Sequence, residues 1–291
     1  MLALWSLLSI LAVTGVSAAT PDEDLKNRPI INSYPNGKID NDLFSTLQNH
    51  AKAPWQWVWP DSSQNVRDSI PRACYDHARR ENLDPKDVSV YDLNHDDCGL
   101  THRLCRHKDA KMSVEKVAEH VGRLPAKLRA LVQNIFIAPG AESAYYSGNI
   151  ILYRGDLNLG SLYHEFGHAL DDHCPFPDKK KLAHDTQAWI DAFYKDDHVT
   201  DEYAKSNQGE NFAQITVHSL YDLNVPGGIS NLGTQTDGRN NWDLYDDERH
   251  AQMQYCKEYL AANNGANCGN VKDDWDFVNK NTGEKVENPY V

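Results

Sequence analysis

The sequence predicts an α+β protein in which a small mixed sheet is followed by a mostly helical half. Two short apolar runs bounded by turn residues, 134–138 and 149–153, predict strands. From residue 160 onward, apolar residues recur at helical spacing in four segments, 160–173, 183–195, 210–222 and 246–262. The chain has 291 residues, enough to bury a substantial core in one large domain or two small ones.

The N-terminus has the composition of a targeting segment. Residues 1–19 contain no charged side chain and end in small residues that fit an A-x-A-like cleavage site. Their apolar run is too short to span a bilayer comfortably. We therefore expect a signal peptide over 1–19 and a secreted, extracellular mature protein.

The mature chain is expected to have two parts. Residues 20–70 are rich in Pro, Asn and Asp and predict an extended, loop-rich stretch. We place this stretch in a disulfide-containing N-terminal lead-in over 20–110, packed on a main domain over 111–291. The first helical pattern of that domain, 113–133, is interrupted by a glycine and a proline and predicts two short helices.

The cysteine content indicates the redox compartment of the protein, and the net charge excludes some classes of partner. Six cysteines, an even number with no C-x-x-C pair, indicate disulfides rather than a cysteine-based zinc site. The net charge of −13 argues against nucleic acid and anionic membranes as partners. We expect a monomer without membrane insertion. The expected disulfides are two local pairs and one long-range pair: Cys98–Cys105, Cys256–Cys268 and Cys74–Cys174.

A metal-binding pattern lies in the first predicted helix of the helical half. The run from His164 to His168, His-Glu-Phe-Gly-His, matches H-E-x-x-H. Histidines four residues apart lie on one helical face and can reach one metal ion. Glu165, beside them, is placed to take a proton from a metal-bound water. The pattern predicts one zinc ion per chain, with Glu165 as the general base of a hydrolase.

Zinc needs a third protein ligand at such a site. The metzincin spacing places a histidine where this chain has Cys174, which we assign to a disulfide. Residues 233–236 begin like the G-T-x-D motif of deuterolysins but lack its aspartate. A carboxylate on a second helix then remains, and Glu210 opens the helical segment 210–222. Glu202, in a predicted loop, is its competitor.

Two motifs resemble those of one peptidase family. Residues 162–172, Leu-Tyr-His-Glu-Phe-Gly-His-Ala-Leu-Asp-Asp, look like the catalytic helix of anthrax lethal factor and its relatives among the gluzincins. In that family the third zinc ligand is a Glu followed by F-F-A, similar to Glu210 and its successors. A Tyr seven residues earlier, matched by Tyr203, assists the transition state. The resemblance implies a zincin-like metallopeptidase domain with an active-site helix, and a zinc ion held by both histidines and Glu210.

The residues around these motifs are given supporting roles. Tyr203 can donate to an oxyanion that forms during attack on a carbonyl. Gln214 stands where the family has an acidic residue, and its amide oxygen can still orient an imidazole. Asp171 and Asp172, one turn after His168, either support the metal site from behind or form a charged helix end.

The predicted strand before the zinc helix completes the expected site. In zincins the substrate-binding edge strand has this place, and an extended peptide can add to it through main-chain hydrogen bonds. The residues expected to contact substrate are Asn149, Ile150, Ile151 and Leu152.

These features predict a secreted zinc-dependent endopeptidase that acts on a protein or peptide. Two alternatives stay open. One is a catalytically weak zincin-fold binding module or toxin-like effector, which Gln214 favours and the intact Glu165 disfavours. The other is a metal hydrolase that acts on non-peptide amides.

Overall fold

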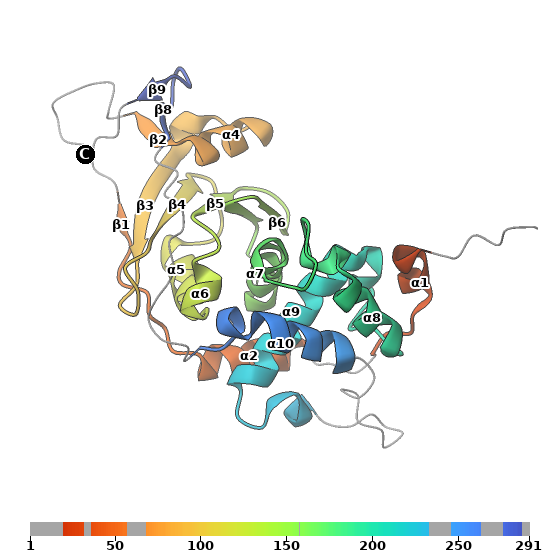
Figure 1. The fold of residues 1–291 in the computed structure, drawn as a ribbon. Coiled ribbons are helices and arrows are strands. Elements are labelled where there is room, and N and C mark those ends of the chain that lie inside the picture. Colours follow the sequence, from red (N-terminus) through yellow and green to blue (C-terminus); the bar gives the residue numbers. More distant parts are fainter. Residues whose placement is uncertain are drawn as a thin grey trace, which may run out of the picture.

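The computed structural model describes residues 20–31, 36–56, 68–156, 158–232, 246–262 and 276–286. Within these ranges the chain is a mixed α+β protein built around a six-stranded sheet (Figure 1). The predicted signal peptide, Cys268 and the segment 233–236 lie outside them.

The main sheet is mixed in direction. Its order is β1-β3-β4-β5-β7-β6, in which β4 runs parallel to β5 and β5 parallel to β7, while the other neighbours are antiparallel. One edge is therefore β6. The strands are β1 (Trp55–Gln56), β3 (Val88–Asn94), β4 (Thr101–His107), β5 (Asn134–Ala138), β6 (Ser143–Ser147) and β7 (Ile150–Arg154).

Both faces of this sheet are covered. On β5, Ile135 and Ile137 join the large core shared with the helices, whereas Phe136 joins the smaller core on the opposite face. A strand buried on both faces needs apolar residues at successive positions, which explains the unbroken run that predicted β5. The strand predicted over 134–138 is confirmed.

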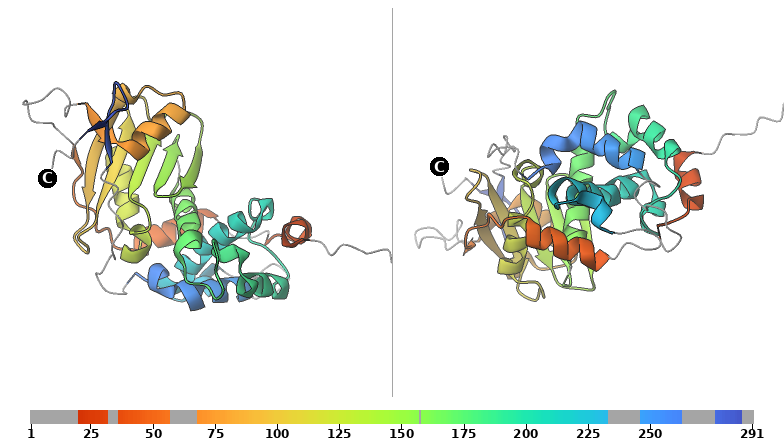
Figure 2. Two further views of the ribbon diagram at one scale, coloured as in Figure 1. Left: turned by 45° about the horizontal axis from the view of Figure 1, so that its top comes forward. Right: turned by 90° about the horizontal axis from the view of Figure 1, so that it is seen from below.

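A small layer covers the face away from the helical half (Figures 1 and 2). It consists of α4 (Arg72–Arg80) and a three-stranded sheet of β2 (Ser69–Pro71), β8 (Phe277–Asn279) and β9 (Lys285–Val286). The disulfide Cys74–Cys105 joins α4 to β4. A short 3-10 turn, η1 (Pro85–Asp87), leads into β3.

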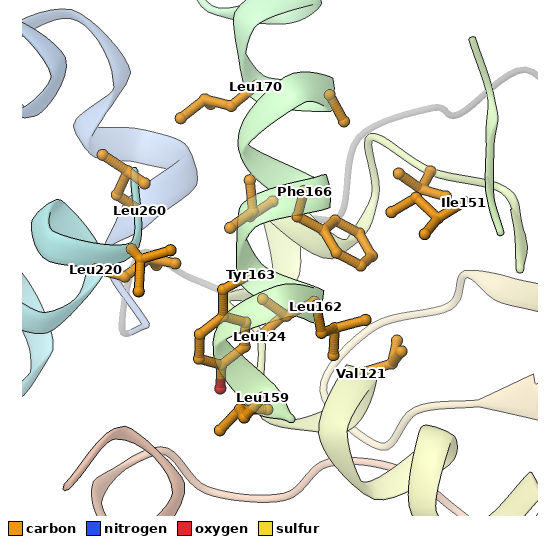
Figure 3. Packing of buried hydrophobic residues seen from close by; sticks show 14 of the residues in the cluster. Val121, Leu124, Ile151, Leu159, Leu162, Tyr163, Phe166, Leu170, Leu220 and Leu260 are labelled. Carbon is orange, nitrogen blue, oxygen red and sulfur yellow. The ribbon is translucent and has the colours of Figure 1, made fainter. Parts of the chain in front are cut away.

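The helical half packs around α7 (Leu159–His173), which lies between the sheet and the last helices. Figure 3 shows Phe166 projecting from α7 toward Ile151 of β7, while Leu220 and Leu260 lie on its other side. The remaining helices are α1 (Pro21–Asn27), α2 (Asn36–Thr46), α5 (Val114–Gly122), α6 (Ala126–Arg129), α8 (Gln187–Lys195), α9 (Gln208–Asn224) and α10 (Asp246–Leu260), with 3-10 turns η2 (Ala183–Asp185), η3 (Ala204–Ser206) and η4 (Gly228–Leu232).

Several sequence-based expectations about local structure are confirmed. Residues 113–133 form two short helices, and the predicted helices near 160, 210 and 246 are α7, α9 and α10. The segment 183–195 is divided into η2 and α8. None of the helices in the described ranges combines the length and apolarity of a membrane span.

The expectation that residues 20–70 are extended is wrong. The stretch 20–70 was predicted to be extended, yet it holds α1, which begins with a capping box at Thr20, and α2. The sheet also draws strands from both sides of residue 110. Helix α1 was missed because its seven residues bury one apolar side chain, Leu25, too few to show a period.

The predicted disulfides are also wrong. Cys105 bonds to Cys74 rather than to Cys98, and Cys174 bonds to Cys256. Pairing follows proximity in the fold, where α7 ends against α10, and not proximity along the chain.

The strand expected to bind substrate does not lie at the edge of the sheet. Ile150, Ile151 and Leu152 belong to β7, which is flanked by β5 and β6, and all three are buried. The carbonyl of Asn149, just before β7, accepts hydrogen bonds from the backbone amides of Gln133 and Asn134, where β5 begins. Ile150, Ile151 and Leu152 are therefore unavailable to an added strand, because β5 and β6 flank their backbone and the core encloses their side chains, whereas Asn149 is half-buried.

Candidate metal centre

Helix α7 carries the H-E-x-x-H motif and is fixed at both ends. At its start, the side chain of Asn158 accepts a hydrogen bond from the amide of Ser161 at 2.9 Å. At its end, Lys179 donates to backbone carbonyls, among them that of Cys174 at 2.9 Å. The same Cys174 is bonded to Cys256 of α10. These contacts fix both ends of α7, through residues close to it in sequence and through α10.

Gly167, inside the motif, lets α9 approach α7 closely. A Cβ atom at this position would lie 2.8 Å from the Cα atom of Ala213 and 3.0 Å from its carbonyl oxygen. Both are backbone atoms of α9 that cannot move aside alone. The missing side chain therefore sets the helix spacing at which Glu210 can reach the histidines.

Three predicted ligand atoms converge between the two helices. The Nε2 atom of His164 lies 3.0 Å from Oε2 of Glu210 and 3.1 Å from Nε2 of His168. The Nε2 atom of His168 lies 3.2 Å from the same Oε2 atom of Glu210, so the three atoms form a nearly equilateral triangle. Ligand atoms around a tetrahedral zinc ion with bonds of about 2.0–2.1 Å lie about 3.3–3.4 Å apart. The three side chains thus need to spread only slightly to hold such an ion.

The protonation of His164 is set by its neighbours. Nε2 of Gln214 donates to Oδ2 of Asp201 at 2.6 Å, which leaves Oε1 of Gln214 to accept from Nδ1 of His164 at 3.1 Å. A neutral imidazole with its proton on Nδ1 presents a lone pair at Nε2. That lone pair faces the carboxylate of Glu210, so the cluster has more acceptors than donors and calls for a cation.

In the site without an ion, the imidazoles themselves stabilise the charge of Glu210. Burial works to raise the pKa of Glu210, yet its contacts with both imidazoles lower it to about 2. Burial works to lower the pKa of His168, and the carboxylate of Glu210 outweighs it, so the net shift is upward. Glu210 is therefore ionised at neutral pH, and a cation, either a metal ion or a proton on His168, stabilises it.

Glu165 and Tyr203 border the same point. Glu165 is 6 % exposed and its carboxylate accepts from the backbone amide of Tyr146, but its Oε2 has no hydrogen-bond partner among the described residues. Burial first, and then the charge of Glu210, raise its pKa. The ring of Tyr203 lies 5.4 Å from that of His164, and this side chain is 55 % exposed. A buried acceptor and an exposed donor thus flank the cluster.

The acidic pair after the motif has other partners. Asp171 accepts from the backbone amide and from Nδ1 of His184, at 2.8 and 2.5 Å. Asp172 accepts from the hydroxyl of Tyr146 at 2.9 Å. Both aspartates therefore tie α7 to neighbouring segments.

Glu202, the competing third ligand, points into solvent. Its side chain is 73 % exposed and pairs with Lys205. Sequence reasoning missed Asp201, the preceding residue, which orients Gln214. A signal was present, because an amide that must accept from a ligand histidine needs an acceptor for its own NH₂ group.

A cleft opens beside the cluster. It has a volume of about 460 Å³, within the usual range for small-molecule sites, and His164, Glu165 and Tyr203 form part of its wall. Glu210 borders a second depression on the other side of Glu165 and Tyr203.

A second group of potential ligands lies where the loop between β3 and β4 meets the segment between α2 and β1. His50, Asp96 and Asp97 have ligand atoms within 4.8 Å of one another. Nδ1 of His50 lies 2.7 Å from Oδ1 of Asp96, and Asp97 forms an ion pair with the fully buried Arg129. The buried guanidinium of Arg129 already compensates the charge of Asp97.

Fold and site together define an α+β protein with a candidate metal centre between two packed helices. The chain belongs to the conidiation-specific protein Con-13 family, whose model matches residues 40–242. Conidiation-specific protein 13 of Neurospora crassa is 30% identical over 186 residues, which is 62% of this chain and 52% of that relative. The chain thus spans about half the length of the relative it matches. No solved structure matches it.

This family membership overturns the peptidase assignment. The matched family and the relative are named for conidiation, so the resemblance to lethal factor-type gluzincins is wrong as an assignment of family. The secreted zinc endopeptidase that it implied, and the classification as a metallopeptidase, are withdrawn with it. The error has a physical origin: H-E-x-x-H specifies two imidazoles on one helical face and does not specify a reaction.

Proposed function

We propose that this protein binds one zinc ion through His164, His168 and Glu210 and presents it to a ligand in the adjoining cleft. The observation that supports this most strongly is the convergence of three acceptor atoms within 3.2 Å, with Gln214 directing the His164 lone pair toward Glu210. Three protein ligands leave one position open on a tetrahedral ion. The ion would supply a Lewis-acidic positive charge at that position.

The residues around the open position would act on the bound ligand. Glu165 would accept a hydrogen bond from it through Oε2, which has no partner among the described residues. Tyr203, half-exposed next to His164, would donate one. Gln214 and Asp201 would keep His164 in the tautomer that binds a metal.

We further propose that the mature protein acts as an extracellular monomer. Two disulfides, Cys74–Cys105 and Cys174–Cys256, support folding in an oxidising compartment. The net charge of −13 supports the expectation that nucleic acid is not a partner.

Titration of the purified, metal-free protein with zinc, followed by calorimetry and metal analysis, tests this function. We expect about one zinc per chain, lost in His164→Ala and Glu210→Ala because two ligands hold zinc poorly. Glu165→Gln should keep the metal, since Glu165 is not among the converging ligands. His173→Ala is the matched control, an exposed histidine on the same helix that bonds to the carbonyl of Ala169. Absence of zinc uptake by the wild type would refute the proposal.

A further inference from the structure

The cleft beside the candidate metal centre is strongly acidic. Asp40, Glu142, Glu165 and Asp201 form part of its wall, and none of the described residues that line it is a Lys or an Arg. Carboxylates gathered around a concave surface concentrate a negative potential there. The charge of the cleft is therefore a property of the wall as a whole and extends beyond the metal ligands.

A bound metal ion would not neutralise this wall. A divalent ion would be matched by the formal charges of the two carboxylates nearest to it, Glu210 and Glu165. Asp40, Glu142 and Asp201 stay uncompensated. Asp201 is bonded to the amide of Gln214, a neutral donor that does not cancel its charge.

Two of these carboxylates are held in positions that favour a cationic neighbour. Asp40, on α2, accepts from the backbone amide of Gly160, while burial, the larger effect, raises the pKa of Asp40 to about 6. Most of it is ionised at neutral pH, in surroundings that disfavour its charge. Glu165 is more than nine-tenths buried and has an oxygen without a partner among the described residues. A positively charged hydrogen-bond donor would stabilise the ionised form of Asp40 and give Oε2 of Glu165 a partner.

The depression on the other side of Glu165 and Tyr203 has a different character. It has a volume of about 510 Å³, and its wall includes Lys181 and His184 as well as Glu165, Asp171, Asp172 and Glu210. Asp171 is already paired with His184. Lys181 thus gives this depression a cationic side chain, which the described residues lining the cleft on the α2 side do not supply.

We propose that the cleft on the α2 side binds a ligand carrying a protonated amine or a guanidinium, next to a group that reaches the metal. The inference rests on the metal centre proposed above and adds the charge of its ligand. An anionic ligand of equal size would meet like charges along the wall and be rejected. Asp40 and Glu142 would contact the cationic group, and Glu165 would lie between that group and the ion.

Three hydroxamates of one chain length test this selectivity on the zinc-loaded protein. They share the metal-binding head and end in an ammonium, a methyl or a carboxylate group: ε-aminocaproyl hydroxamate, caproyl hydroxamate and adipoyl monohydroxamate. By calorimetry we expect the amine to bind about tenfold tighter than the methyl compound, and the carboxylate to bind more weakly than either. Raising the salt from about 0.05 to 0.5 M should reduce this preference, because the wall is open to solvent.

Variants locate the effect. In Asp40→Asn with Glu142→Gln, the preference for the amine should fall to about twofold, while caproyl hydroxamate binds as before. Glu202→Gln removes an exposed charge outside the cleft and should leave all three affinities unchanged. Zinc uptake with three equal affinities, or with the carboxylate tightest, would overturn this inference alone. Absence of zinc uptake would overturn the proposed function and this inference together.

Discussion

Two regions of the molecule bring a histidine-containing cluster of potential metal ligands together, and they differ in how its negative charge is compensated. Between α7 and α9, His164, His168 and Glu210 face one another within 3.2 Å. On the β3–β4 loop, Asp97 pairs with Arg129 and Asp96 contacts His50. The comparison teaches that proximity of ligand atoms is not enough, since a permanent cation, Arg129, already pairs with Asp97, whereas only imidazoles face Glu210.

The largest expected effect concerns the helix spacing that makes the first cluster possible. Gly167→Ala would place a Cβ 2.8 Å from the backbone of Ala213, so α7 and α9 must separate. We expect a loss of about 3 kcal/mol in the free energy of unfolding, and weaker zinc binding. Gly99→Ala, on the β3–β4 loop, meets open space and should change stability by about 0.5 kcal/mol or less. Chemical denaturation of both variants measures this, and equal stabilities would contradict it.

The second prediction tests whether the loop cluster is structural. Arg129 is fully buried and donates to the carbonyls of Gly122 and Leu124 in addition to pairing with Asp97. Asp97→Asn leaves that guanidinium without its counter-charge and should cost about 2 kcal/mol of stability. Zinc stoichiometry should remain that of the wild type. Loss of a bound metal in this variant would show that the comparison between the clusters is wrong.

The third prediction tests the support of His164. Gln214→Leu removes the acceptor that sets the imidazole proton. Zinc affinity should fall about tenfold, toward the lower end for such supporting residues because an amide is a weaker acceptor than a carboxylate. Competition with a fluorescent chelator measures it. Asp96→Asn, which alters the loop cluster, is the control and should leave the affinity unchanged; a parallel loss there would count against the assigned site.

The smallest expected effect concerns a buried acid behind α9. Glu248 is fully buried beside Asp196, accepts from the side chain of Asn211, and has a pKa raised well above its usual value, first by burial and then by the charge of Asp196. Because the folded pKa is the higher one, the contribution of Glu248 is full below about pH 4.5 and is lost as the pH rises.

Glu248→Gln removes this titration. The variant should therefore be about 1 kcal/mol more stable than the wild type at pH 7 and gain little at pH 4. Thermal unfolding of both proteins across this pH range gives the difference directly. A variant that is destabilised equally at both pH values would show that folding does not raise the pKa of Glu248.

Sequence patterns predicted the parts of this molecule that depend on local periodicity. The run 134–138 is a doubly buried strand, and the face of α7 follows from its spacing. Edge strand β6 was missed because its residues are mostly half-buried and form no clear alternation. The disulfides were missed because Cys174 meets Cys256 only once α7 and α10 pack.

In the candidate site, too, local spacing predicted some residues, whereas others could be found only in the folded structure. His164 and His168 are adjacent on one helix, so their spacing placed them together, and the structure brings Glu210 to them. Asp201 is set by the loop before α9, which has no periodic signal. The reaction could not be predicted, because a pair of imidazoles on a helix is compatible with many chemistries.

The bond between Cys174 and Cys256 has a consequence for how a metal would enter. It joins residues 82 positions apart and anchors the end of α7 independently of any ion. In small zinc domains the metal itself organises the chain, so release of the ion unfolds it. Here the covalent tether and the α7–α9 contact at Gly167 keep the three side chains assembled beforehand. Loading and release would then be a local exchange with little change in heat capacity, and the vacated site would be ready to accept another ion at once.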